Sequence, residues 1–258
     1  MTVTAAYKER SRAVVEIDAT GMETRALNTK LRELVSSGID KIKIINVCGQ
    51  RYIGTDLNKP VDIEIVGTPG NDLGSFMDDP QIVVQGNAQD GCGNTMNNGK
   101  IIVHGHAGDV LGLAARGGTI FIRDGVGYRC GIHMKEYGEQ KPVLVIGGSA
   151  QDFLGEYMAG GTLIVLGLDL KKGEGHRAKY IGTGMHAGSI YLRGTVDNYQ
   201  LGKEVGTAEL TETDTPILER YVHEYSEYFG VDTAKILDAK FIKLFPLYLR
   251  PYGTLYAY

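Results

Sequence analysis

Residues 81–86 read QIVVQG, residues 100–105 read KIIVHG and residues 119–124 read TIFIRD. One short pattern therefore returns every 19 residues (100 − 81 and 119 − 100). It extends on both sides, from about residue 60 to residue 193. A period of about 20 residues with one short strand per unit is typical of a solenoid. The expected strands are Ile63–Val66, Ile82–Gln85, Ile101–His104, Ile120–Arg123, Val143–Ile146, Leu163–Leu166 and Ile190–Arg193.

Glycines follow the expected strands and recur in the turns. Glycine adopts backbone conformations that a Cβ atom obstructs, so these positions are interpreted as structural corners of a coil. The corners after the strands are Gly67, Gly86, Gly105, Gly147, Gly167 and Gly194, with Asp124 replacing glycine in the fourth unit. The second corners are Gly74, Gly93, Gly112, Gly131, Gly155 and Gly182.

Alignment of the units on the first corner separates two faces of the strands. The residues four and two positions before the corner are all aliphatic, whereas the residue directly before it is mixed. Because strand side chains alternate, the aliphatic positions are predicted to point inward and the mixed position outward. Two more apolar columns flank the second corner: Leu73, Cys92, Leu111, Cys130, Leu154 and Ile181 before it, and Met77, Met96, Ala115, Met134, Met158 and Met185 after it. This pattern predicts a mainly β fold, a single-stranded right-handed parallel β-helix of about seven rungs.

The flanking segments differ from the repeat, and three regions are expected: a lead-in and cap over 1–59, the glycine-rich β-helix over 60–198 and a tail over 199–258. The lead-in is predicted to be α/β, with an amphipathic helix over 24–36 and a strand over Ile42–Val47. The tail is predicted to be α-helical, with helices over Ile217–Phe229 and Asp232–Phe245. Its last 13 residues, from Pro246, are rich in tyrosine and either pack back as a cap or dock on a partner.

Bulk composition excludes several functional classes. The net charge of −4 provides no basic footprint for nucleic acid. No apolar run reaches 18 residues, which argues against a membrane span. The first residues lack the apolar core of a signal peptide, and three cysteines in 258 residues fit a reducing compartment. A cytoplasmic location is therefore expected.

Few residues qualify as candidates for chemistry. Cys92 and Cys130 occupy a column otherwise filled by Leu and Ile, which favours buried, inert thiols. No Cys-x-x-Cys motif encodes an iron–sulfur or zinc site. His104 and His106 form a His-x-His pair, a weak candidate for metal binding, whereas two solvated surface histidines are the favoured interpretation. We therefore assign no catalytic, cofactor or metal residue.

An insertion at Leu168–Lys179 is the best candidate for a contact surface, because insertions in solenoids often lie on the binding face. It contains Lys171, Lys172, His176, Arg177 and Lys179, which would suit a partner protein or an anionic ligand. An ordinary solvated loop is the alternative. Recurring aspartates at positions 72, 90, 109 and 152 are expected to bond to turn backbone, although a polar ladder is also possible.

These motifs together resemble the GXGXG family of glycine-rich repeat domains, which includes the C-terminal β-helix of the glutamate synthase large subunit. The recurring pattern is Gly-Asp-x-x-Gly-x-x-Met-x-x-Gly-(Thr/Lys)-Ile-x-Val-x-Gly, and GEYMAGGTLIVLG at 155–167 is close to it. The Leu27-Asn28-x-x-Leu31 and Arg51-x-x-Gly54 steps resemble the lead-in of that domain. The tail resembles its end at Ala234, Leu237, Phe241, Lys243 and Pro246. The resemblance covers about residues 24–250.

The resemblance implies a non-catalytic structural subunit without a cofactor of its own. In glutamate synthase the FMN, the iron–sulfur cluster and the glutamine amidotransferase nucleophile belong to other domains. As a stand-alone chain, this protein would hold amidotransferase and FMN/iron–sulfur synthase subunits together while glutamine and 2-oxoglutarate yield glutamate. The same family implies alternatives: the equivalent subunit of an N-methylglutamate synthase or of a formylmethanofuran dehydrogenase-like complex. An independent scaffold, homo-oligomer or small-molecule binder is a further one.

Overall fold

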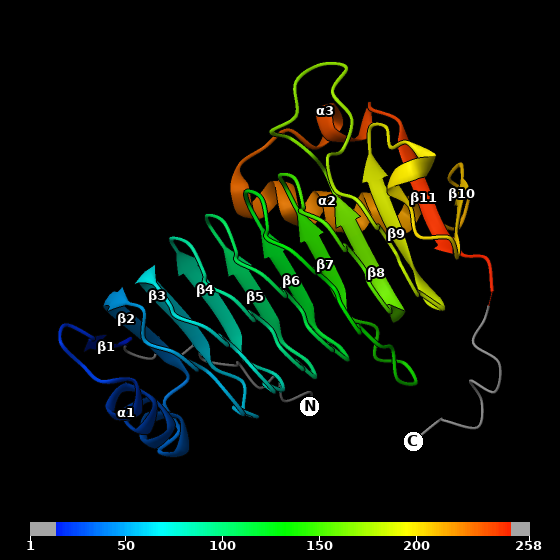
Figure 1. Ribbon diagram of the computed structural model, residues 1–258. Helices are drawn as coiled ribbons and strands as arrows, with labels where there is room; N and C mark the ends of the chain where they lie inside the picture. The colour runs from blue at the N-terminus through cyan, green and yellow to red at the C-terminus, as the bar shows by residue number, and fades with distance from the viewer. Residues whose placement is uncertain (1–13, 249–258) are drawn as a thin grey trace, which may run out of the picture.

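The computed structural model describes residues 14–248, which form one continuous sheet coiled into a β-helix (Figure 1). The strand order is β1-β2-β3-β4-β5-β6-β7-β8-β9-β11-β10. The strands are β1 (Val15–Asp18), β2 (Lys41–Cys48), β3 (Asp62–Thr68), β4 (Gln81–Gln85), β5 (Lys100–Val103), β6 (Thr119–Ile122), β7 (Val143–Ile146), β8 (Ala159–Val165), β9 (Ala187–Arg193), β10 (Val205–Ala208) and β11 (Phe241–Pro246). The helices are α1 (Thr24–Ser36), α2 (Thr215–Phe229) and α3 (Thr233–Leu237), with a 3₁₀ turn at Asn198–Gln200.

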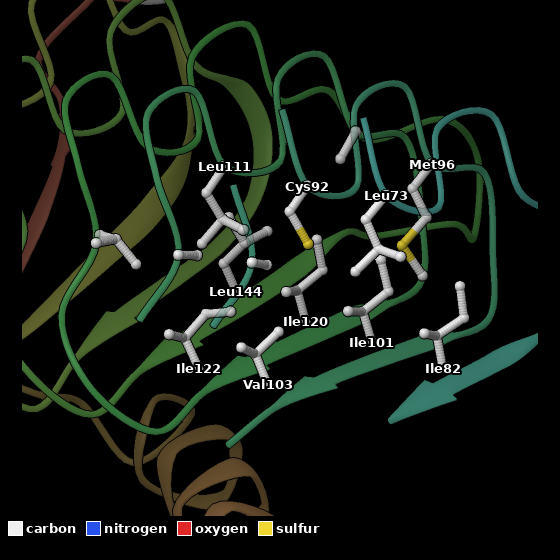
Figure 2. Close-up of a cluster of buried hydrophobic side chains, with 14 of the residues drawn as sticks. Leu73, Ile82, Cys92, Met96, Ile101, Val103, Leu111, Ile120, Ile122 and Leu144 are labelled. Carbon is white, nitrogen blue, oxygen red and sulfur yellow. The ribbon is translucent and has the colours of Figure 1, made fainter. Parts of the chain in front are cut away.

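Consecutive rungs stack in parallel, and like residues pair with like. Ile63 pairs with Ile82, Ile82 with Ile101, and Ile101 with Ile120, each in a parallel register. All of these side chains are buried in one interior cluster, and Figure 2 shows several of them in a row. The predicted parallel β-helix is thus confirmed, with an aliphatic stack as its core.

The interior also contains the columns predicted beside the second corners. Leu73, Cys92 and Leu111 are at most 1% exposed, as are the methionines that follow (Figure 2). A third column, of alanines and one valine, was not anticipated: Ala88 bridges to Ala107, which bridges to Val126. Small side chains suit this position because it faces the sheet across the narrow coil.

The alignment of the fifth unit was wrong by one residue. Leu144, rather than Val143, pairs with Ile120 and Leu163, so Leu144 and Ile146 point inward. Val143 and Val145 pack instead in a second cluster on the outer face. Gly147 therefore occupies the outward position before the corner, and Gly148 takes the corner.

Tyr225 explains why the outward position at 147 is glycine. Its hydroxyl donates to the Arg123 carbonyl at 2.8 Å. A Cβ atom at position 147 would collide with that hydroxyl and with the same carbonyl. The glycine thus admits a helix residue to the sheet, a contact that no repeat pattern encodes.

Helix α2 covers the outer face of the later rungs, where the sequence pattern indicated a solvated surface. Its buried residues Leu218, Val222 and Tyr225 pack on the outward side chains of β5–β9, which include Phe121, Ile164 and Tyr191. Lys100 on β5 adds a polar contact, because its Nζ lies 3.0 Å from Glu224 Oε2 and 2.6 Å from the Tyr228 hydroxyl. The helix ends at Gly230 in the left-handed conformation (φ 67°), as predicted.

The last predicted helix was wrong. Only Thr233–Leu237 is helical, and Phe241–Pro246 forms β11, which pairs antiparallel with β9 and β10. Along β11 the side chains alternate, with Leu244 in the interior cluster and Phe241 in the outer cluster. The strand satisfies the open edge of β9, and that demand outweighs helix propensity. At the other end, α1 and the strands β1 and β2 match the predicted lead-in and continue the same sheet. The tyrosine-rich residues from 249 onward lie outside the described residues.

Asp214 ties the C-terminal elements to the coil. Its Oδ1 accepts hydrogen bonds from the Tyr191 hydroxyl at 2.7 Å and from Lys243 Nζ at 2.6 Å. Its Oδ2 accepts from the backbone N–H of Thr211 at 2.9 Å and from the Thr211 hydroxyl at 2.6 Å. The side chain is 3% exposed. Burial opposes the charge, but the hydrogen bonds of Lys243, Thr211 and Tyr191 prevail and lower the pKa of this carboxyl.

We expect Asp214→Ala to lower the free energy of unfolding by about 3 kcal/mol, because it leaves Lys243 and Tyr191 without their buried partner. Chemical denaturation at pH 7 measures the change. Glu209→Ala is the matched control, because Glu209 pairs with Lys240 on the exposed surface and such pairs contribute about 0–1 kcal/mol. Equal effects of the two variants would contradict the role of the network.

The stabilising effect of Asp214 should depend on pH. A carboxyl whose pKa is lowered in the folded state stabilises that state above its unfolded pKa of about 3.9 and loses this contribution as the pH falls through the folded value. The difference in unfolding free energy between wild type and Asp214→Ala should therefore shrink below about pH 4. Denaturation series between neutral and acidic pH test this, and a constant difference would refute it.

Thiol reagents should distinguish the three cysteines. Cys48 is exposed, whereas Cys92 and Cys130 are 1% exposed, and burial raises the pKa of Cys92 to about 12 and also that of Cys130. In the native protein at pH 8, a chromogenic disulfide reagent should modify a single thiol rapidly, and Cys48→Ser should abolish this phase. Rapid modification of the native Cys48→Ser variant would show that the interior columns are open to solvent.

Candidate functional site

A cleft of about 820 Å³ lies at the corners of the central rungs, between the 168–179 insertion and the end of α2. Its charged and polar lining is contributed by several rungs and includes His106, Arg123, Asp124, Ser149, Asp169 and Arg177. Leu168, Tyr225 and Val231 add an apolar side. The cleft brings together His106 and Arg177, two residues that the sequence analysis had named separately.

Glycines contribute to the lining because consecutive rungs approach closely there. A Cβ atom at Gly148 would lie 2.7 Å from the Gly125 nitrogen. A Cβ atom at Gly127 would collide with the Asp109 carboxylate. The corner glycines therefore have a packing origin, and the cleft is hollow because these residues lack side chains.

The charged groups of the cleft are paired with one another. Arg123 donates from Nε and Nη2 to Asp124 at 3.0 and 2.9 Å, and this pairing lowers the pKa of Asp124. His106 Nε2 lies 3.7 Å from Asp124 Oδ2, while its Nδ1 accepts from the Gly125 N–H at 3.3 Å. Ser149 donates to Asp169 at 2.8 Å. Such a lining suits a polar ligand or the side chains of a partner; no nucleophile here is hydrogen-bonded to a base histidine.

The His-x-His pair does not form one site. His104 is half-buried against α2, with its ring centroid 5.1 Å from that of Phe229, and burial lowers its pKa. His106 is exposed and lines the cleft. Within residues 14–248, no group of three or more His, Cys, Asp or Glu side chains is arranged to hold a metal ion.

The insertion presents its cations to solvent, with one exception. Lys171, Lys172, Arg177 and Lys179 are exposed. His176, which we had expected at the surface, is 6% exposed, and its Nε2 lies 2.8 Å from the Arg193 carbonyl oxygen. Burial lowers its pKa. This imidazole anchors the base of the loop, and its contact with the next rung could not be inferred from the charge pattern.

The recurring aspartates form a ladder between rungs. Asp90 Oδ1 accepts from the Asp109 N–H at 2.9 Å, and Asp109 Oδ1 accepts from the Tyr128 N–H at 2.8 Å. Asp152 Oδ1 accepts from the Lys179 N–H at 2.8 Å. These carboxylates bond to backbone, as expected, but to the following rung, so they hold the register of the coil.

Aromatic side chains form an exposed strip that the sequence analysis missed. Phe153 stacks on Tyr180 with centroids 4.9 Å apart, and the Arg129 guanidinium lies 4.5 Å from the Phe153 centroid. All three residues have positive φ, between 57° and 66°. Their columns contain Asp72 or Gly91 in earlier rungs, so the change to large side chains was the available signal.

Comparisons with known proteins agree with this architecture. A protein of Methanocaldococcus jannaschii, described only as uncharacterized, is 51% identical over 250 residues, covering 94% of this chain and 96% of its own. A chain in the crystal structure of the formyltransferase/hydrolase complex from Methylorubrum extorquens, determined with methylofuran, has a similar fold. Its TM-score is 0.58 at 18% identity, covering 87% of this chain and 91% of that one. The fold is thus shared with a subunit of a multi-subunit complex.

The sequence model of the GXGXG motif family matches residues 25–250. The matched region contains every rung of the coil, both helical flanks and the closing strands β10 and β11. The chain is therefore a member of the GXGXG motif family.

Proposed function

We propose that this protein is the structural β-helix subunit of a split glutamate synthase-type complex, which converts glutamine and 2-oxoglutarate to glutamate. The observation that carries the proposal is the family match over nearly the whole chain. The similar length of the Methanocaldococcus relative supports a domain that occurs as a separate chain. The partners would be a glutamine amidotransferase and an FMN/iron–sulfur synthase, with FMN and the cluster on those chains.

The role we propose is positional. An eleven-stranded sheet that closes on itself rung by rung is a stiff spacer, and channelling between two active sites requires a fixed separation. The interior is filled by stacked aliphatic side chains and inert thiols. No residue of the chain is assigned a catalytic role. A cytoplasmic location, where such substrates are found, is part of the same proposal. No helix in residues 14–248 is long and apolar enough to cross a membrane.

A second candidate is the corresponding subunit of a formylmethanofuran dehydrogenase-like complex. It is favoured by the fold shared with the formyltransferase/hydrolase complex chain. An N-methylglutamate synthase-type complex fits the same family. In all three cases the β-helix would contact other chains, and we assign that contact to the exposed cations of the 168–179 insertion.

Affinity purification of the tagged full-length chain from its native cells, followed by mass spectrometry, tests the proposal. We expect amidotransferase and flavin-synthase chains to co-purify, with glutamine-dependent glutamate formation lost when this chain is omitted from the reconstituted complex. Recovery of formyltransferase or dehydrogenase chains would favour the second candidate. Recovery of the chain alone, or as a homo-oligomer, would refute the subunit role.

Charge reversal tests the contact surface. The double variant Lys171→Glu/Lys172→Glu should reduce recovery of the partner chains at least tenfold, since like charges opposed across an interface cost several kcal/mol. Lys30→Glu/Arg32→Glu, on the exposed side of α1, is the control and should retain the partners. Unchanged recovery with the first variant would place the interface elsewhere on the coil.

A further inference from the structure

A second cavity, of about 350 Å³, lies at the opposite end of the rungs from the corner cleft. The step between units is longer here, 23 residues from Asp124 to Gly147 (147 − 124), against 19 in the preceding rungs. Part of the extra length forms a small antiparallel turn, in which Tyr137 and Gln140 exchange backbone hydrogen bonds of 2.9 and 3.0 Å. The cavity is lined by Asn97, Arg116, Lys135, Tyr137 and Gln140.

Three of these residues form one column of the coil. The N–H groups of Asn97, Arg116 and Lys135 donate to the interior-column carbonyls of Met77, Met96 and Ala115 at 2.9, 2.8 and 2.9 Å. They therefore occupy equivalent positions in consecutive rungs, about 4.8 Å apart. The 137–140 turn adds a tyrosine and an amide to this column. The cavity is thus built by the repeat together with its own insertion.

The charges of this cavity are unbalanced, in contrast to the corner cleft. Arg116 and Lys135 place two cations on adjacent rungs, and none of the lining residues is acidic. The Arg116 side chain makes no ion pair or hydrogen bond with any residue in 14–248, whereas Arg123, Arg129 and Arg177 each pair with a carboxylate. The neighbouring Glu136 is engaged elsewhere, because its Oε2 accepts from the Gly161 N–H at 3.2 Å.

We propose that this cavity binds a small oxyanion, a carboxylate or phosphate group. The Arg116 guanidinium offers a planar set of donors suited to paired oxygens, and Lys135 supplies a second positive charge. The amides of Asn97 and Gln140 and the Tyr137 hydroxyl add neutral donors. The volume is at the small end of ligand pockets, which suits a metabolite smaller than a nucleotide. A chain with a net charge of −4 has no general attraction for anions, so local geometry is required. The proposal does not depend on the subunit role.

Isothermal titration calorimetry on the full-length chain at low ionic strength tests the site. Inorganic phosphate and glutarate are titrated separately, so that the phosphate and carboxylate classes are distinguished. We expect at least one of them to bind with a Kd near or below about 1 mM. Arg116→Gln should weaken that binding about tenfold or more, since it removes a charge-assisted contact.

Arg32→Gln is the matched control, because Arg32 is an exposed arginine on α1 and its substitution removes the same net charge. It should leave the Kd unchanged. A second variant, Gln140→Ala, tests the turn and should weaken binding more moderately; circular dichroism establishes that each variant is folded. The proposal fails if neither anion binds below about 10 mM, or if Arg116→Gln and Arg32→Gln bind as the wild type does.

Discussion

The parallel pairing of each rung with the next is the constraint on which the rest of the molecule depends. It forces equivalent residues to stack, as Ile82, Ile101 and Ile120 do, so a substitution in one rung is felt by its neighbours. It also explains the glycines, because a Cβ atom at a corner meets the backbone of the preceding rung. The aspartate ladder acts in the same direction, since each carboxylate bonds to the backbone of the following rung. Function can therefore vary only in the outward positions and in the insertions.

The repeat made the interior predictable. A fixed period and two aliphatic columns sufficed to assign strands, inward faces and the buried cysteines. The same method failed where the period slipped: Gly147 looks like a corner, but Tyr225 occupies the space beside it. Contacts between distant segments carry no periodic signal. Helix α2 on the outer face and the pairing of β11 with β9 are of this kind, and so is the burial of His176.

The outer face shows how a helix changes the meaning of a solenoid surface. Without α2, Phe121, Ile164 and Tyr191 would expose a continuous apolar area, which is a hazard for association. The helix covers this area, and Lys100 and Asp214 fix it through hydrogen bonds to tyrosines. Covering one face leaves the corners and insertions for contacts. This agrees with a scaffold whose partners approach from defined directions.

The two cavities differ in a way that bears on their use. In the corner cleft Arg123 pairs with Asp124 and Arg177 with Glu174, so an incoming charge must compete with an existing partner. A surface of this kind favours exchange of ion pairs with another protein, where many weak contacts act together. The 137–140 cavity has no acidic lining, and its arginine is without a partner among residues 14–248. There an anion would relieve repulsion between adjacent rungs without displacing any partner of Arg116. Partner contact and ligand binding can thus lie at opposite ends of the same rungs without interfering.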